Sequence, residues 1–350
     1  MRPVAAPHPR RYLVMRLSAI GDVVLTLPVL RAALRHDPDL ELVVLTRPFL
    51  HGLLADWERV HLPVIDLKGR HRGLRGLWRL FRELRSQHQV DGVLDLHDVL
   101  RTQVLRSLYA LAGTPVYHLH KDRQGRRRMT RRHHKDRRPV RHSLRNYAAV
   151  FQQAGVPLRV QPEAVSPFSY AAHGLPVDSA LPRPWVGVGP FASKPEKMYP
   201  LDRMQTVIEG LAAAGITVFL FGGPTDRAWF APLARAHATV HIAPIDPLPQ
   251  ELALIEALDL MLSVDSANTH LARLVGTRVL SIWGPTHPDA GFRPLGPVDP
   301  ADFIQIPVED LPCRPCSVVR QTPCYRGDRA CMHWIGPEQV LARIEAALAK

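Results

Sequence analysis

Asp22 is the first residue of the sequence whose type and position could do chemistry. It follows Gly21 at the end of the turn at residues 18–22, after an apolar segment and before a helical pattern. Glycine adopts backbone conformations that other residues rarely adopt. At a helix start, Asp22 could act as a general base or simply cap the helix, and its spacing alone favours capping.

A second candidate lies where an apolar run at residues 260–264 stops at an acidic residue. The turn that follows offers a carboxylate, hydroxyls and an imidazole, from Asp265, Ser266, Ala267, Thr269 and His270. A strand that ends at a helix N-terminus presents unpaired N–H groups and the positive end of a dipole to an anion. We therefore expect a phosphate here, with His270 in a structural or phosphate-contacting role.

Two further loops carry groups that suit a nucleotide. Ser193 and Lys197 precede a helical pattern and could engage a diphosphate through a hydroxyl and a point charge. Gly222 and Gly223 let the backbone approach a ligand, and Asp226 could cap a helix or bind ribose hydroxyls. The chain has neither the dinucleotide fingerprint nor the P-loop pattern. The sequence therefore lacks the motifs that usually indicate a dehydrogenase or a nucleotide hydrolase.

The elements that position these loops alternate between near-continuous apolar strands and amphipathic helices. Such alternation predicts parallel sheets covered on both faces, with ligands beyond the carboxyl ends of the strands. The expected strands lie at residues 12–17, 42–46, 60–67, 90–96, 116–119, 185–188, 217–221, 240–243, 260–264 and 278–283.

The length of 350 residues exceeds one ordinary core, so two domains are expected. We place an N-terminal Rossmann-like domain at residues 1–165, with a basic loop at 120–142. A proline-rich linker at 166–184 follows. A C-terminal Rossmann-like domain at 185–350 carries a cysteine-rich segment at 313–331 and a terminal helix. The sequence thus predicts an α/β fold with two domains facing a central cleft.

The net charge of +13 is concentrated in one stretch. Residues 121–145 hold 12 Lys and Arg against Asp122 and Asp136, which gives 12 − 2 = +10. This run could bind nucleic acid, anionic lipid headgroups or a phosphorylated substrate, or could be a solvated loop. It contains no Phe, Tyr or Trp for base stacking, which argues against nucleic acid.

The four cysteines form the pattern C-x2-C-x7-C-x6-C, at Cys313, Cys316, Cys324 and Cys331. They match an all-cysteine metal site in ligand number, although six residues separate the last pair. A structural zinc or iron–sulfur site and reduced thiols in a tight loop both remain open. No apolar run approaches the ~20 residues that span a bilayer. The N-terminal residues do not read as a signal core, so we expect a cytoplasmic protein.

Several of these stretches together resemble one family. They are R-L-S-A-I-G-D-V-V-L-T-L-P-V-L-R-A-A-L, S-K-P-E-K-M-Y-P, F-G-G-P-T-D, D-S-A-N-T-H-L-A-R-L-V-G-T and W-G-P-T-H-P. In this order and spacing they are similar to the bacterial heptosyltransferases, glycosyltransferases of lipopolysaccharide synthesis. The likeness extends from Tyr12 to about Pro288. Three features depart from the family: Ala267 stands where glycine is usual, His287 stands where Asp is common, and only some members have the cysteine cluster.

The resemblance implies a GT-B fold and an inverting transfer of a heptose or related sugar from an ADP-sugar, without a catalytic metal or other cofactor. It places the general base on Asp22, which reverses the preference for capping, and the phosphate-neutralising lysine on Lys197. Ser193, Asp226 and the turn at residues 265–270 would bind the donor.

The implied acceptor is a lipopolysaccharide core or lipid A, a polyanion at the inner face of the cytoplasmic membrane. We expect Ser18, Gly21, Arg126, Arg127 and Arg128 to contact it, and residues 126–141 to meet the anionic membrane surface. The alternatives are transfer with another nucleotide sugar or acceptor, and a non-catalytic protein that binds sugar nucleotides or polyanions.

Overall fold

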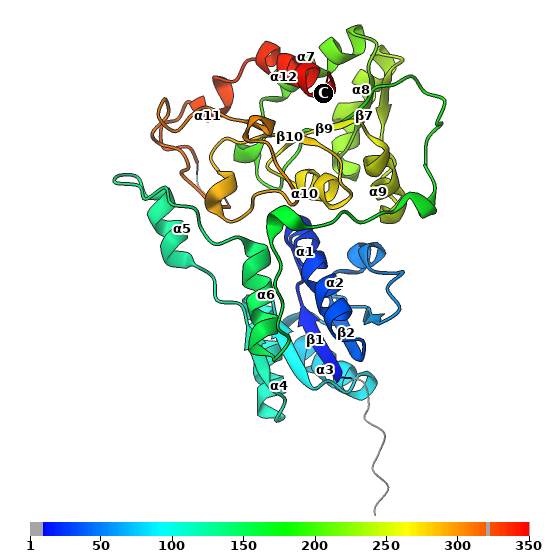
Figure 1. The fold of residues 1–350 in the computed structure, drawn as a ribbon, viewed down its shortest axis with the longest axis vertical. Coiled ribbons are helices and arrows are strands. Elements are labelled where there is room, and N and C mark those ends of the chain that lie inside the picture. The colour runs from blue at the N-terminus through cyan, green and yellow to red at the C-terminus, as the bar shows by residue number, and fades with distance from the viewer. Residues whose placement is uncertain (1–9, 320–322, 350) are drawn as a thin grey trace, which may run out of the picture. The chain divides into compact units, whose positions relative to one another are not determined.

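The computed structural model describes residues 10–319 and 323–349. It divides the chain into two compact units (Figure 1). Unit 1 comprises Met1–Lys121 and Ser143–Gln161, and unit 2 comprises Asp122–His142 and Pro162–Lys350. Each unit has its own parallel sheet, which confirms the predicted α/β class. The domain boundaries proposed from the sequence stay a prediction.

Unit 1 is built on five parallel strands in the order β3-β2-β1-β4-β5. The strands are β1 (Arg10–Met15), β2 (Leu40–Leu45), β3 (Val60–His61), β4 (Gly92–Asp95) and β5 (Val116–His118). Helices α3 (Gly73–Gln87) and α4 (Leu100–Leu111) pack on one face of the sheet through apolar side chains. Helices α2 (Leu27–His36) and α6 (Ser143–Gln153) pack against each other; α2 also contacts β2, and α6 contacts β4 and β5.

Two predicted elements of unit 1 are shorter than expected. The helical pattern after the first strand is split into α1 (Ile20–Val24) and α2, with the break just before Pro28, which lies in the first turn of α2. Proline is tolerated in a first turn, where its missing N–H would be unbonded anyway. The third strand ends at His61, two residues before Pro63, which cannot donate a backbone hydrogen bond.

Unit 2 contains six parallel strands in the order β11-β10-β9-β6-β7-β8. They are β6 (Trp185–Gly189), β7 (Thr217–Leu220), β8 (Val240–Ile242), β9 (Leu260–Val264), β10 (Val279–Ile282) and β11 (Phe303–Ile304). The helices are α7 (Leu201–Ala213), α8 (Arg227–Ala236), α9 (Leu248–Ala257), α10 (Ala267–Leu274), α11 (Ala330–His333) and α12 (Pro337–Leu348).

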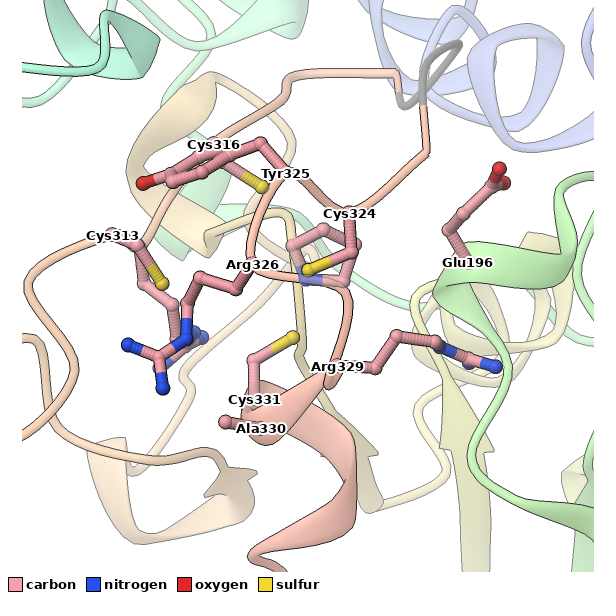
Figure 2. A pocket seen from close by; sticks show the side chains of 11 residues that line it. Glu196, Cys313, Cys316, Cys324, Tyr325, Arg326, Arg329, Ala330 and Cys331 are labelled. Atoms are coloured by element: carbon pink, nitrogen blue, oxygen red, sulfur yellow. The ribbon is translucent and has the colours of Figure 1, made fainter.

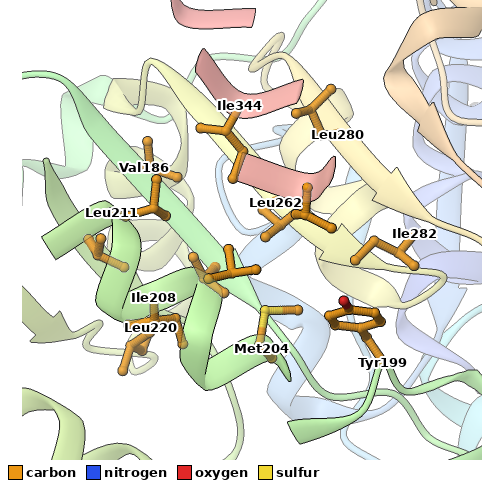
Figure 3. Packing of buried hydrophobic residues seen from close by; sticks show 14 of the residues in the cluster. Val186, Tyr199, Met204, Ile208, Leu211, Leu220, Leu262, Leu280, Ile282 and Ile344 are labelled. Atoms are coloured by element: carbon orange, nitrogen blue, oxygen red, sulfur yellow. The ribbon is translucent and has the colours of Figure 1, made fainter. Parts of the chain in front are cut away.

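The core of unit 2 forms where α7 and α12 cover the sheet (Figure 3). Met204, Ile208 and Leu211 of α7 and Ile344 of α12 meet strand residues such as Leu262, and all are fully or almost fully buried. Each such side chain contributes roughly 1.5–3 kcal/mol by leaving water. This core fixes the strand ends that carry the site.

The basic segment of residues 122–142 packs with unit 2, although the sequence analysis placed it in the N-terminal domain. It contains the helix α5 (Arg123–Thr130), capped by Asp122, whose side chain accepts the N–H of Gly125 at 2.7 Å. Backbone and side-chain bonds hold it: Val140 N–H donates to Asp289 O at 2.8 Å, and Lys135 Nζ donates to Pro315 O at 2.8 Å. These bonds explain why residues 122–142 belong to unit 2.

The strand order of each sheet defines one switch point, where consecutive connections leave in opposite directions. In unit 1 it lies between β1 and β4, and in unit 2 between β6 and β9. Ligands of open parallel sheets bind beyond the carboxyl ends of the strands at such a point. The segments that follow these four strands contain Asp22, in α1, and His97, Lys197 and Asp265.

In the part of the chain that the structure describes, no helix is long and apolar enough to cross a membrane.

Candidate active site

Asp22 lies in α1, directly after β1, and its two carboxylate oxygens have different partners. Oδ2 is 2.7 Å from Nη2 of Arg16 and accepts the backbone N–H of Ala19 at 3.3 Å. Oδ1 accepts the hydroxyl of Tyr147, on α6, at 3.3 Å. Ala19 and not Asp22 is the N-cap residue of α1; Asp22, the third residue of the helix, bonds back to the N–H of Ala19 and also forms the ion pair with Arg16.

Arg16 is buried and holds the Asp22 carboxylate from the end of β1. Its Nη1 donates to the carbonyl of Leu96 at 2.7 Å, and its guanidinium lies 5.6 Å from the ring centroid of Tyr147. Burial alone would lower the pKa of Arg16, but Tyr147 and Asp22 raise it above its ordinary value. The guanidinium therefore stays charged beside the carboxylate.

His97 follows β4 on the other side of the unit 1 switch point. Its Nδ1 faces the backbone N–H of Leu17 at 3.4 Å. Burial, helped by the charges of Arg16 and Lys121, lowers the pKa of His97 to about 3. The imidazole is therefore neutral at physiological pH and does not supply a competing cation to Asp22.

The unit 2 switch point brings Lys197 and Asp265 together. Lys197, in the loop after β6, places Nζ 2.7 Å from Oδ2 of Asp265, and both side chains are largely buried. The hydroxyl of Thr286, in the loop after β10, donates to the same oxygen at 2.6 Å. Three loops that are distant in sequence thus meet at one carboxylate, and the pairing of Lys197 with Asp265 was not foreseen.

The turn after Asp265 forms the start of α10, as the sequence predicted. Ser266 is the N-cap residue, but its hydroxyl lies 3.1 Å from Oγ of Ser263 and does not cap the helix. Thr269 is buried, and its hydroxyl donates to Val264 O at 2.9 Å. His270 is also buried. Ser266 and Ala267 are partly exposed, so their backbone N–H groups are the better candidates for an anion.

The other residues proposed to bind the donor do not contact Lys197 or Asp265. Asp226 stands at the N-cap position of α8 but makes no side-chain capping bond to that helix; its carboxylate instead accepts the backbone N–H of Gly223 at 2.7 Å, in the short turn before α8. Gly222 leaves no room for a side chain, because a Cβ there would collide with Phe230. Ser193 is exposed. The structure does not bring Ser193 or Asp226 into the Lys197–Asp265 contact.

The candidate acceptor residues belong to both units. Ser18 and Gly21 are partly exposed in the turn that ends at Asp22 in unit 1. Arg126, Arg127 and Arg128 belong to α5 in unit 2. The guanidinium of Arg126 lies 5.0 Å from the ring centroid of Phe292.

The four cysteines line one pocket of unit 2, together with Glu196 and Tyr325 (Figure 2). All four are free thiols and are partly exposed. Burial raises the pKa of Cys331 to about 11, so this thiol is protonated at neutral pH. Among the residues that the structure describes, no three His, Cys, Asp or Glu side chains are arranged to hold a metal ion.

Arg314, between the first two cysteines, is a buried residue that sequence reasoning missed. Its guanidinium donates to the carbonyls of Gly284 at 2.7 Å and Trp283 at 2.9 Å. Burial lowers its pKa to about 10. It holds the loop after β10, which also carries Thr286. The cysteine-rich segment is thereby attached to the loop that contacts Asp265.

Two parallel-sheet units of this kind are the architecture of GT-B glycosyltransferases. The fold matches the structure of E. coli ADP-heptose lipopolysaccharide heptosyltransferase II with a TM-score of 0.70, covering 97% of this chain and 98% of that one at 17% identity. This likeness confirms the GT-B fold.

The family follows from the sequence. The family model described as glycosyltransferase family 9 (heptosyltransferase) matches residues 77–319, more than half of the chain. The chain belongs to this family, and it is a glycosyltransferase.

Two curated proteins are similar over most of their length. The lipopolysaccharide core heptosyltransferase OpsX of Haemophilus influenzae is 26% identical over 295 residues, which cover 82% of each chain. Lipopolysaccharide heptosyltransferase 1 of Pseudomonas aeruginosa is 25% identical over 364 residues, covering 97% of this chain and 98% of that protein. The family resemblance in the motifs is thereby confirmed.

Proposed function

We propose that this glycosyltransferase transfers a heptose from an ADP-sugar to the lipopolysaccharide core or lipid A, with inversion at the anomeric carbon. The names of the relatives support the sugar and the acceptor class. The observation that carries the mechanism is the Asp22 carboxylate, held by buried Arg16 at the carboxyl end of β1, with Oδ1 only weakly engaged.

On the donor side, Lys197 and the start of α10 are proposed to bind the diphosphate. When the sugar leaves, negative charge develops on the diphosphate, and a lysine and helix N–H groups stabilise it. Asp265 holds Lys197 in place through the 2.7 Å ion pair. A diphosphate would then share the lysine with Asp265, so affinity depends on both groups.

On the acceptor side, Asp22 is proposed to take the proton of the attacking hydroxyl. The hydroxyl oxygen forms a bond to the anomeric carbon, while the bond from that carbon to the diphosphate oxygen breaks on the opposite face. The proton passes to Asp22, and the nucleotide diphosphate leaves as an anion without being protonated. One carboxylate is therefore sufficient for the proton transfer.

The Asp22→Asn substitution tests the proposed base. The amide keeps the size of the side chain but cannot accept the proton, so we expect transfer to fall by about 10² or more. Nucleotide affinity should stay within a few-fold, since Asp22 is proposed to act on the acceptor. A variant that retains the parental rate removes Asp22 from the mechanism.

The alternative donors are distinguished by a thermal-shift screen of ADP-, UDP- and GDP-sugars. A ligand that binds only the folded protein raises its melting temperature. We expect the ADP-sugar to give the largest shift. A larger shift with UDP- or GDP-sugars assigns another donor, and binding of the ADP-sugar without any transfer indicates a non-catalytic module.

The anionic acceptor and the inner membrane surface also fit the positive charge of the chain. We propose that Ser18 and Gly21 contact the acceptor near Asp22, and that Arg126, Arg127 and Arg128 attract its acidic groups. The enzyme would then act at the cytoplasmic face of the membrane, in contact with anionic lipids.

A structural zinc at the four cysteines remains a proposal from the sequence. The clustering of the thiols around one pocket supports it, whereas their arrangement does not form a metal-binding group of three among the described residues. Elemental analysis of the purified protein decides it: one zinc or iron per chain supports a metal site, and a folded, metal-free sample rejects it.

A further inference from the structure

The outer face of α3 combines exposed apolar side chains with arginines. Leu74 and Trp78, one helical turn apart, are 72% and 51% exposed. The exposed arginines of the same helix are Arg75, Arg79, Arg82 and Arg85. At ~100° per residue these six side chains fall within an arc of roughly 140°. The opposite side of α3 is buried in the unit 1 core.

The positive charge of this face is largely uncompensated. Within the described chain, the side chains of Arg75, Arg79 and Arg82 make no hydrogen bond or ion pair. Residues 68–85 contain seven Lys and Arg and a single acid, Glu83. Glu83 is already paired with Arg70 and with His71. The α3 face therefore offers several cations to an external anion.

The basic segment of residues 122–142 differs from the α3 face in the pairing of its cations and in the burial of its apolar residues. Several of its cations bind within unit 2: Lys135 donates to Pro315 O at 2.8 Å, and Arg138 pairs with Asp136 at 2.6 Å. Its large apolar residues, Met129 and Val140, are buried. This segment can attract anions, but it has no apolar group to insert into a lipid layer.

The direction of α3 relates its outer face to Asp22 within unit 1. The helix precedes β4, which is parallel to β1, so it runs back from the carboxyl edge of the sheet towards the opposite edge. Its first turn, with Leu74 and Arg75, is therefore at the end that lies nearer the Asp22 edge. A layer of headgroups against this turn would present its glycolipids at that edge.

We propose that the outer face of α3 is the surface by which this protein docks on an anionic lipid bilayer. Leu74 and Trp78 would enter the boundary between headgroups and acyl chains, and the arginines would contact lipid phosphates. The biological sense of this docking rests on the proposed function, in which the acceptor is a membrane glycolipid. The binding itself does not require catalysis.

Co-sedimentation of the full chain with vesicles tests the proposal. We expect binding to equimolar phosphatidylcholine and phosphatidylglycerol vesicles and weak binding to phosphatidylcholine alone. Leu74→Ser with Trp78→Ala should weaken binding about tenfold or more, because both apolar groups lose their place in the lipid. Arg75→Gln with Arg79→Gln should also weaken it, by roughly fivefold per arginine.

The matched control is Arg159→Gln with Arg235→Gln, which removes the same charge from exposed sites elsewhere. This control should bind vesicles like the parent. The substituted side chains are exposed, although the Trp78 ring also lies 5.4 Å from that of Phe81. Circular dichroism should therefore not change, and the melting temperature should fall only in the variant that lacks Trp78. The proposal is overturned if both α3 variants bind vesicles as well as the parent does. It is also overturned if the control pair loses as much binding as they do, or if the parent does not bind vesicles.

A separate readout distinguishes this docking from the proposed function. With a water-soluble acceptor fragment and no vesicles, the α3 variants should transfer sugar at the parental rate, whereas Asp22→Asn should be slower by about 10² or more. Vesicle binding without any transfer by the parent would reject the proposed function and leave the docking surface standing. Transfer by the parent without vesicle binding would support the proposed function and reject the docking surface.

Discussion

At the scale of the residue, Arg16 fixes the position of the Asp22 carboxylate, the proposed base. It occupies Oδ2 at 2.7 Å, while Oδ1 has only the Tyr147 hydroxyl at 3.3 Å. Oδ1 is therefore the oxygen that we propose takes the proton of the acceptor hydroxyl. Buried charges paired in this way hold their geometry well, since removing one partner leaves the other uncompensated. We infer that Arg16 positions the base.

Substitution of Arg16 tests this positioning role. Arg16→Gln removes a charge-assisted bond worth roughly 1.5–3 kcal/mol, so we expect kcat to fall about 10–100-fold. Arg16→Lys keeps a cation and should recover part of the loss. Calorimetry should show unchanged ADP affinity for both variants, because the proposed donor site lies in unit 2. Equal, small losses in both variants would argue that Arg16 only supports the fold.

The buried Glu251 side chain should make the stability of the protein depend on pH. Burial raises its pKa from 4.5 to about 8, so the folded protein holds this proton where the unfolded chain has lost it. The stabilising contribution is complete below pH 4.5 and is lost as the pH rises towards about 8. Glu251→Gln should flatten this decline and raise the melting temperature at about pH 9. Parallel melting curves for variant and parent between these pH values would contradict the assignment.

At the scale of the element, the candidate residues of each unit follow the strand ends at that unit's own switch point. The loops after β6, β9 and β10 meet at Asp265, where Lys197 and Thr286 share one oxygen. Arg314 holds the last of these loops by its carbonyls. The geometry of the lysine therefore depends on packing at some distance from the proposed phosphate site.

Removing Lys197 should weaken nucleotide binding directly. We expect Lys197→Ala to raise the dissociation constant of ADP by about 10–100-fold, as for a lost bond between charged groups. Isothermal titration with ADP measures it. Unchanged affinity would end the role that we assign to this lysine.

Thr286→Val should act indirectly, by freeing Asp265 to turn away from Lys197. We expect a smaller loss of ADP affinity, of a few-fold, consistent with one neutral donor to a charged acceptor. Thr206→Val is a matched control, because Thr206 is exposed on α7 and its hydroxyl donates to Asp202 O, away from Asp265. If Thr286→Val and Thr206→Val bind ADP with the same affinity, Thr286 has no role in nucleotide binding.

The strands and most helices could be predicted from the sequence because buried parallel strands are continuous apolar runs. The strand β9 occupies residues 260–264 as predicted. Individual site residues such as Asp22, Lys197 and Asp265 could be named because each follows such a strand.

Their partners could not be predicted, since no local pattern encodes them. Tyr147 lies 125 positions from Asp22 and reaches it only through the packing of α6. Arg314 follows a cysteine and looks like an exposed cation until the loop after β10 folds around it. The grouping of residues 122–142 with unit 2 likewise depends on bonds to distant loops, such as that from Val140 to Asp289.

At the scale of the whole molecule, each unit presents one half of the proposed chemistry. Unit 1 holds the carboxylate and the α3 face, and unit 2 holds the lysine, the start of α10 and the cysteine-rich segment. Family membership establishes a glycosyltransferase, and the proposed reaction assigns proton removal to unit 1 and stabilisation of the leaving group to unit 2.

The most direct test of this account is a transfer assay with purified protein, ADP-heptose and a lipopolysaccharide core acceptor. We predict that the acceptor gains the mass of one heptose, with the anomeric configuration inverted relative to the donor, and that Asp22→Asn lowers the transfer rate by about 10² or more. Retention of configuration, or a fully active Asp22→Asn variant, would contradict the mechanism. A folded parent protein that binds the donor but transfers no heptose would contradict the proposed function.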